Sequence, residues 1–233
     1  MLGNLTKAEA VYRETRWRIL TGALPPATAV NQAELAAEFG VSQTPVREAL
    51  LRLESEGLVV FVAHSMVRVS PLDLQEFDEL YAIRVNLDSF AGQLAAANRT
   101  PEDVAKLKDL LASKAAGLDD RLQRNLEFHR SIYRASRNKQ LTMLLDQLWD
   151  RTERYRIVLV AKEAGSPQYQ GSHSDEDHRA IAMALFEGDG EKVAALLRQH
   201  VQQSHDLIRS MLEDRSVAHI AAAPPPDGGS RAR

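Results

Sequence analysis

The sequence predicts a mainly α-helical protein in two domains, with three helices and a small β hairpin in the first and an all-α six-helix bundle in the second. Residues 1–70 combine short amphipathic stretches with two β-rich runs, whereas from residue 71 onward apolar residues recur only at helical spacing. Ser70-Pro71 marks the change between domains 1–70 and 71–215. Residues 216–233 are rich in Ala, Pro, Gly and Ser without periodicity, so we expect a disordered tail there.

Composition limits the class of protein. The chain has 233 residues, of which 44% are hydrophobic and 26% charged, as in an ordinary globular protein with a sizeable core. It has no cysteine, which excludes a disulfide framework and thiolate chemistry. No stretch approaches the roughly 20 apolar residues of a membrane span, and residues 1–10 lack the apolar core of a signal peptide. We therefore expect a soluble, cytoplasmic protein with no membrane partner.

Residues 32–59 predict two short helices joined by a tight turn. Asn31 can cap the first helix, and Glu34 is placed to reach back to the cap amide. Gly40 permits the left-handed conformation that a sharp turn needs. Thr44-Pro45 predicts the start of the second helix, because proline suits the first helical position. Val46, Ala49, Leu50 and Leu53 then follow at inward-facing spacing.

This arrangement is a helix-turn-helix whose exposed end is suited to DNA. The residues left exposed around the second helix N-terminus are Ser42, Gln43, Thr44 and Arg47. Helix N-termini and hydroxyls bind phosphate, arginine pairs with phosphate or guanine, and glutamine can make two hydrogen bonds to adenine. Two β-rich runs, 58–62 and 67–69, follow as a wing, and we include His64 and Ser65 at its tip among the predicted DNA contacts. The alternative is an ordinary helical hairpin inside a core.

The neutral net charge of this domain favours a protein that binds DNA as a dimer. Residues 1–70 hold seven Lys or Arg and seven Glu, so the domain is neutral, unlike the usual strongly basic nucleic-acid binder. We expect modest affinity per domain and a two-fold homodimer, because half-sites repeat about every helical turn of duplex DNA.

The second domain is expected to place three histidines where helices face one another. Its six helices are predicted at 74–98, 101–117, 119–136, 138–162, 174–187 and 190–215, with a loop at 164–172. His129, His178 and His200 lie on three of them beside inward-facing apolar residues, and Asn125 lies one turn before His129. Such a set favours a divalent metal such as Zn or Ni. The alternative is that each is a core histidine hydrogen-bonded to a neighbour.

Arg84 is the second feature of this domain. It lies mid-helix among apolar residues, where an arginine commonly covers core with its stem and reaches solvent. The functional alternative is a clamp for an organic carboxylate through two parallel hydrogen bonds.

Both domains resemble known families. The run ELAAEFGVSQTPVREALLRLESEGLV resembles the winged-helix domain of GntR-type bacterial transcription regulators. The helical part resembles the FCD-type effector-binding domain of the FadR subgroup through Tyr81-Ala-Ile-Arg84, Phe128-His129, Asp177-His178 and Gly188-Asp189 leading to His200. The resemblance implies a divalent metal, held in many members by one Asp and three His, at Asn125, His129, His178 and His200. It also implies that Arg84 contacts a carboxylate effector beside the metal.

The chain departs from these families at three places. Many members have Arg where Gln43 stands, and an Arg-Gly pair where Ser65-Met66 stands, which puts the usual operator preference in doubt. Asn125 replaces the Asp of the metal site and so removes a negative charge and a hard oxygen ligand.

The leading interpretation is a ligand-responsive transcriptional regulator, a repressor, that binds double-stranded operator DNA as a homodimer and a small organic acid as effector. One alternative is a metal-dependent helical-bundle enzyme, although the chain has no HExxH, G-x-S-x-G or P-loop motif. Another is a DNA-binding dimer whose helical domain has no ligand.

Overall fold

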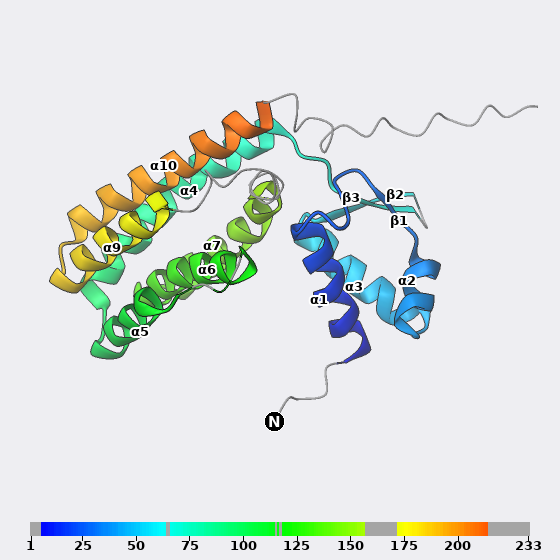
Figure 1. Ribbon diagram of the computed structural model, residues 1–233, viewed down its shortest axis with the longest axis horizontal. Helices are drawn as coiled ribbons and strands as arrows, with labels where there is room; N and C mark the ends of the chain where they lie inside the picture. Colours follow the sequence, from blue (N-terminus) through cyan, green and yellow to red (C-terminus); the bar gives the residue numbers. More distant parts are fainter. Residues whose placement is uncertain (1–5, 64–65, 115, 117, 157–171, 214–233) are drawn as a thin grey trace, which may run out of the picture. The chain divides into compact units, whose positions relative to one another are not determined.

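The computed structural model (Figure 1) describes residues 6–63, 66–114, 116, 118–156 and 172–213. Contacts within the chain define two compact units, one extending through Leu72 and the other comprising Asp73–Met211. The predicted mainly α-helical fold, with a small sheet in the first unit and only helices among the described residues of the second, is confirmed. None of the helices in the described ranges combines the length and apolar character that a membrane crossing would need.

The first unit is a winged helix-turn-helix. Its helices are α1 (Lys7–Leu20), α2 (Gln32–Phe39) and α3 (Gln43–Ser55), and its strands are β1 (Ala29–Val30), β2 (Val59–Ala63) and β3 (Met66–Val69). The antiparallel sheet has the order β1-β3-β2, with Val67 of β3 opposite Val30 of β1 and Phe61 of β2. The sequence does not predict the short strand β1, because two residues are too few to show the alternation of apolar and polar side chains that marks a strand. The wing tip at His64 and Ser65 lies outside the described residues.

Local signals fix the turn between α2 and α3. The Asn31 side chain accepts hydrogen bonds from the amides of Ala33 and Glu34, and Gly40 ends α2 with φ of 62°. The Glu34 carboxylate accepts a hydrogen bond from the Asn31 side-chain amide at 2.9 Å, whereas the sequence predicts one from the Asn31 backbone amide. Helix α3 starts at Gln43, earlier than the predicted start at Thr44-Pro45. Proline is tolerated within the first turn, because the first backbone amides of a helix have no partner within it. All four predicted inward residues of α3 are buried.

The second unit is built around the long helix α4 (Leu74–Asn98), which packs against α6 (Leu118–Ala135), α7 (Lys139–Glu153) and α9 (Ser172–Glu187). The remaining elements are α5 (Pro101–Ala112), the 3-10 turn η1 (Arg154–Arg156) and α10 (Gly190–Glu213). Thr100 and Asp103 form a reciprocal capping box at the start of α5. The helix predicted to reach residue 162 ends at Glu153, where η1 tightens the chain, and the residues after 156 are outside the described ranges.

Trp17 and Leu144 are two large apolar residues of the helices that are exposed. Trp17 is 50% exposed because the buried face of α1 follows Val11, Thr15 and Ile19, and residue 17 falls opposite that stripe. Leu144 is 52% exposed because α7 buries Leu141, Leu145 and Trp149 at intervals of four, which leaves position 144 outside.

Helices α4 and α10 run side by side (Figure 1), and Gly92 lets them approach closely. A Cβ added at Gly92 would lie 2.7 Å from Cγ1 of Val193 and closer still to Cδ1 of Leu197, both on α10. These two side chains are fully buried and have little room to move.

We predict that Gly92→Val lowers the free energy of unfolding by about 1–3 kcal/mol, because it overpacks the contact between α4 and α10. Urea unfolding followed by circular dichroism measures this difference. Ala97→Val is the matched control, because Ala97 is an exposed residue of the same helix and should show only the small helix-propensity cost. Equal losses in the two variants would contradict the close approach.

Candidate functional site

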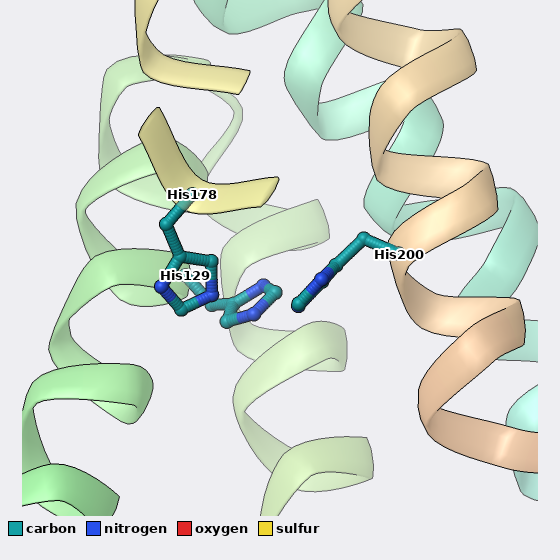
Figure 2. A group of neighbouring side chains, drawn as sticks. All are labelled: His129, His178 and His200. Carbon is teal, nitrogen blue, oxygen red and sulfur yellow. The ribbon is translucent and has the colours of Figure 1, made fainter. Parts of the chain in front are cut away.

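Three histidines meet inside the helical unit. His129 of α6, His178 of α9 and His200 of α10 each offer one nitrogen, and these three nitrogens lie within 4.8 Å of one another. Figure 2 shows the three imidazoles pointing toward a common point from three different helices. Their residues are only 2–6% exposed. The packing of α6, α9 and α10 thus brings together the three histidines that the sequence predicts to face one another.

Neighbouring rings hold the imidazoles in place. The His178 ring stacks on Phe128 with centroids 3.9 Å apart, and the His129 ring lies 4.7 Å from the Trp149 ring. Nδ1 of His200 lies 3.1 Å from the Asp177 carboxylate. By contrast, Nε2 of His178 is buried and has no hydrogen-bond partner among the described residues. A buried polar nitrogen without a partner is costly, so a core histidine satisfied by its neighbours is a poor description of His178.

Burial keeps the cluster uncharged. It lowers the pKa of His129 to about 4, and it also lowers the pKa of His178, whose neighbouring histidines add to the effect, and that of His200, despite the nearby Asp177. Metal ions bind the neutral imidazole, so this environment disfavours the competing proton. The donor set and the unpartnered nitrogen of His178 both fit a divalent metal such as Zn²⁺ or Ni²⁺.

Asn125 lies at the edge of this cluster. It lines a small cavity with His129, His200, Arg84 and Arg156. Its Nδ2 is buried without a hydrogen-bond partner in the described part of the chain. The cavity has a volume of about 10 Å³, which is room for roughly one water molecule.

A buried carboxylate that the sequence did not reveal contacts the cluster. Asp88 of α4 is fully buried, and its Oδ1 lies 3.6 Å from Nδ1 of His129. Burial alone would raise the pKa of Asp88, but the Arg84 charge, His129 and Tyr133 bring it down to about 2. The spacing of Arg84 and Asp88, four residues apart on one helix, was the available signal, but it is equally typical of a surface ion pair.

Arg84 is buried and forms hydrogen bonds with other side chains of the protein. It is 4% exposed, its Nε lies 3.4 Å from the Asp88 carboxylate, and its Nη1 donates to Thr152 at 3.1 Å. Its guanidinium also lies 4.3 Å from the Trp149 ring centre. The stem does not reach solvent, so the surface-covering alternative for Arg84 is wrong. Arg156 of η1 is a second guanidinium at the same cavity, with a buried Nε that forms no hydrogen bond within the described residues.

In the first unit, the predicted reading residues Ser42, Gln43, Thr44 and Arg47 are all exposed. Arg47 makes no ion pair with any residue in the described ranges, and its guanidinium lies 6.0 Å from the Phe61 ring of the wing. Other arginines of the unit are paired, for example Arg18 with Glu38 and Arg52 with Glu9. Gln43 and Arg47 line an open groove together with Met66 of the wing and the start of α2.

Comparison with known proteins identifies these two units. A winged helix-turn-helix joined to a helical unit with a histidine cluster defines the class of two-domain DNA-binding regulators. Residues 7–69 match the family described as "Bacterial regulatory proteins, gntR family", and residues 79–203 match the FCD domain. The chain belongs to the GntR family of bacterial transcriptional regulators and carries an FCD domain. The family consists of regulators and not of enzymes, so the enzyme alternative is wrong.

Several relatives cover most of the chain. The HTH-type transcriptional regulator McbR of Escherichia coli is 31% identical over 83% of this chain and 89% of its own length. A probable D-xylose utilization operon transcriptional repressor of Paenarthrobacter nicotinovorans is 35% identical over 78% of this chain and 80% of its own. The solved structure of E. coli McbR/YncC aligns with a TM-score of 0.76 at 28% identity, covering 90% of this chain and all of that one.

We predict that the metal-free protein loses stability as the pH falls from about 7 to 5. The folded pKa of His129 is about 4, below its ordinary value of 6.5, so the unfolded chain binds more protons in this window. The contribution of each buried neutral histidine to the free energy of unfolding is fully present above pH 6.5. As the pH falls below 6.5, toward the folded pKa, this contribution is lost at about 1.4 kcal/mol per pH unit. Urea unfolding at several pH values measures this slope.

The matched comparison is His178→Gln, which removes one of the buried titrating groups. Its unfolding free energy should depend less steeply on pH than that of the wild type. Equal slopes for the two proteins would contradict a buried neutral His178.

Proposed function

We propose that this protein is a ligand-responsive transcriptional repressor that binds operator DNA as a homodimer and a small organic carboxylate in its FCD domain, with a divalent metal at the histidine cluster. The observation that supports the proposal most strongly is the convergence of three neutral, buried imidazoles in the same chain as an exposed helix-turn-helix. Relatives described as repressors support the direction of regulation. DNA binding in a bacterial regulator also implies a cytoplasmic location.

The DNA-binding proposal rests on α3. Its N-terminus carries Ser42, Gln43 and Thr44, whose small polar side chains and free amides suit phosphate and base edges. Arg47, one turn further, has no internal ion pair in the described ranges and is therefore available to phosphate or guanine. His64 and Ser65 remain proposed wing contacts. Because each domain offers few cationic contacts, two copies must act together, which supports the homodimer.

The metal proposal rests on His129, His178 and His200, with the Asn125 amide oxygen as a weaker fourth donor. A bound divalent ion would supply a Lewis-acid position for an oxygen of the effector. The protein's own contribution is to exclude water and to hold three imidazoles neutral and oriented. Asn125 adds no negative charge, so we expect weaker metal binding than an aspartate would give.

The effector proposal rests on the positive charge beside the metal site. Arg84 and Arg156 both line the cavity, and guanidinium groups pair well with carboxylates. A cavity of about 10 Å³ cannot admit an organic acid, so binding must move surrounding elements. A ligand that binds only the opened arrangement shifts the helical domain toward it, and DNA binding shifts reciprocally. The small cavity also favours a second candidate, a DNA-binding dimer without a ligand.

For DNA binding, we predict that Arg47→Ala weakens binding to the gene's own promoter DNA by about 1–3 kcal/mol per reading helix without changing thermal stability. A fluorescence anisotropy titration at several salt concentrations measures the affinity and its salt slope. Arg13→Ala is the matched control, because Arg13 is exposed on α1 and paired with Glu9. Wild-type affinity in the Arg47 variant would show that the reading helix is misassigned.

For the FCD domain, we predict that Zn²⁺ or Ni²⁺ raises the melting temperature of the metal-free protein and that His178→Ala abolishes this shift. Metal at a hundredfold excess over Kd stabilises the folded state by about 2.7 kcal/mol. His205→Gln is the matched control, because His205 lies on α10 but contacts Asp78 instead of the cluster. A screen of small carboxylic acids with and without metal then identifies the effector.

The result of this thermal-shift experiment separates the two candidate functions. A metal shift that survives in His178→Ala would contradict the assigned site. If neither metal nor any acid shifts the wild type, the ligand-free DNA-binding dimer is the correct function.

A further inference from the structure

The carboxylate of Asp88 is surrounded by hydrogen-bond donors. Nε and Nη2 of Arg84 lie 3.4 and 3.5 Å from its two oxygens, and the Tyr133 hydroxyl donates to Oδ1. An ionised carboxylate accepts hydrogen bonds and donates none. The remaining neighbour, Nδ1 of His129, lies 3.6 Å from the same Oδ1, just beyond hydrogen-bond distance. Within the described residues this nitrogen has no other hydrogen-bond partner, so Asp88 is the acceptor available to it.

Asp88 contacts the cluster without being part of it. The group of ligand atoms that lie within 4.8 Å of one another comprises the three histidines and does not include Asp88. Asp88 therefore lies behind His129, on the Nδ1 side of its ring. A metal-bound histidine commonly donates its second N–H to a carboxylate, which fixes both the tautomer and the orientation of the ring.

A second histidine of the cluster has the same arrangement. Nδ1 of His200 lies 3.1 Å from Oδ2 of Asp177, the residue of α9 that precedes His178. Nε2 of His178 is the buried nitrogen without a partner in the described ranges. In His129 and His200, therefore, Nδ1 is the nitrogen that faces a carboxylate.

We infer that Asp88 is a positioning residue of the metal site: it accepts the Nδ1 hydrogen of His129 and leaves Nε2 of that ring to bind the metal. This inference rests on the proposed metal site. It assigns to α4 the buried carboxylate that serves the site, in a chain where Asn125 offers only an amide. It also gives Arg84 a role in the protein without effector, because Arg84 is the buried counter-ion of Asp88.

The first test uses the wild-type protein without metal. Long-range ¹H–¹⁵N correlation spectra of ¹⁵N-labelled protein report which ring nitrogen of each histidine carries the hydrogen, and a His129→Gln variant assigns the relevant signals. The inference predicts a neutral His129 with hydrogen on Nδ1. Hydrogen on Nε2 of His129 would overturn it. This test is independent of metal affinity, so it stands even if the wild type binds no metal and the proposed metal site fails.

The second test measures Zn²⁺ affinity by competition with a chromophoric chelator. Asp88→Asn should weaken Zn²⁺ binding about 10- to 100-fold. The amide places its own N–H donors against those of Arg84 and Tyr133, and it no longer fixes the His129 tautomer. Tyr133→Phe is the matched control: it removes one hydrogen bond to the same carboxylate, keeps the contact with His129 and should bind Zn²⁺ within a few-fold of wild type.

The two variants distinguish positioning from general stability. Asp88→Asn leaves Arg84 buried without its counter-ion, so its fold is checked first by circular dichroism and by DNA binding. A folded Asp88→Asn protein with wild-type Zn²⁺ affinity would overturn the inference, as would an equal loss in Tyr133→Phe. If Asp88→Asn does not fold, the His129 tautomer in the wild type decides.

Discussion

The helical unit depends on one buried ion pair, Arg84 with Asp88, both on α4. Neither charge reaches solvent. Arg84 is also hydrogen-bonded to Thr152 and lies over the Trp149 ring of α7, and Asp88 accepts a hydrogen bond from Tyr133 of α6. Removing one partner of such a pair leaves an uncompensated buried charge, which costs about 3–5 kcal/mol. The pair therefore ties α4 to α6 and α7.

This constraint bears on how an effector would act. A carboxylate that binds Arg84 through Nε and Nη2 must take the place of Asp88, and Asp88 would then need another partner or a proton. Binding and rearrangement are linked for this reason, because Arg84 cannot serve the ligand and Asp88 with the same hydrogen bonds. Arg156 is held less tightly, since its Nε forms no hydrogen bond within the described residues and lies 3.9 Å from the Glu153 carboxylate. The two guanidiniums therefore differ in what an incoming acid must displace.

Local sequence signals predicted the first unit well, whereas the site in the second depended on contacts between distant helices. Asn31, Gly40 and the apolar spacing of α3 each act within a few residues, so their consequences could be read directly. The three histidines were predicted as a cluster because each lies beside inward-facing residues. Asp88 was missed because an acid four residues after an arginine is commonly a surface pair, and only the packing of α6 and α7 over α4 buries it.

The net charge of the DNA-binding unit, which is zero, does not reveal which of its cations are unpaired. Its acidic residues are largely used within the unit: Glu9 binds Arg13 and Arg52, and Glu38 binds Arg18. The charges within these pairs offset one another in the net charge of the domain, and each arginine is already paired with an acid and is less available to DNA. Arg47 keeps its charge available because no acid in the described ranges pairs with it. Electrostatic attraction to a duplex depends on such unpaired charge near the reading helix, so a neutral domain can still present a local positive surface. In the proposed homodimer, two such small surfaces held at the right spacing would supply the affinity, and a rearrangement in the helical unit would control that spacing.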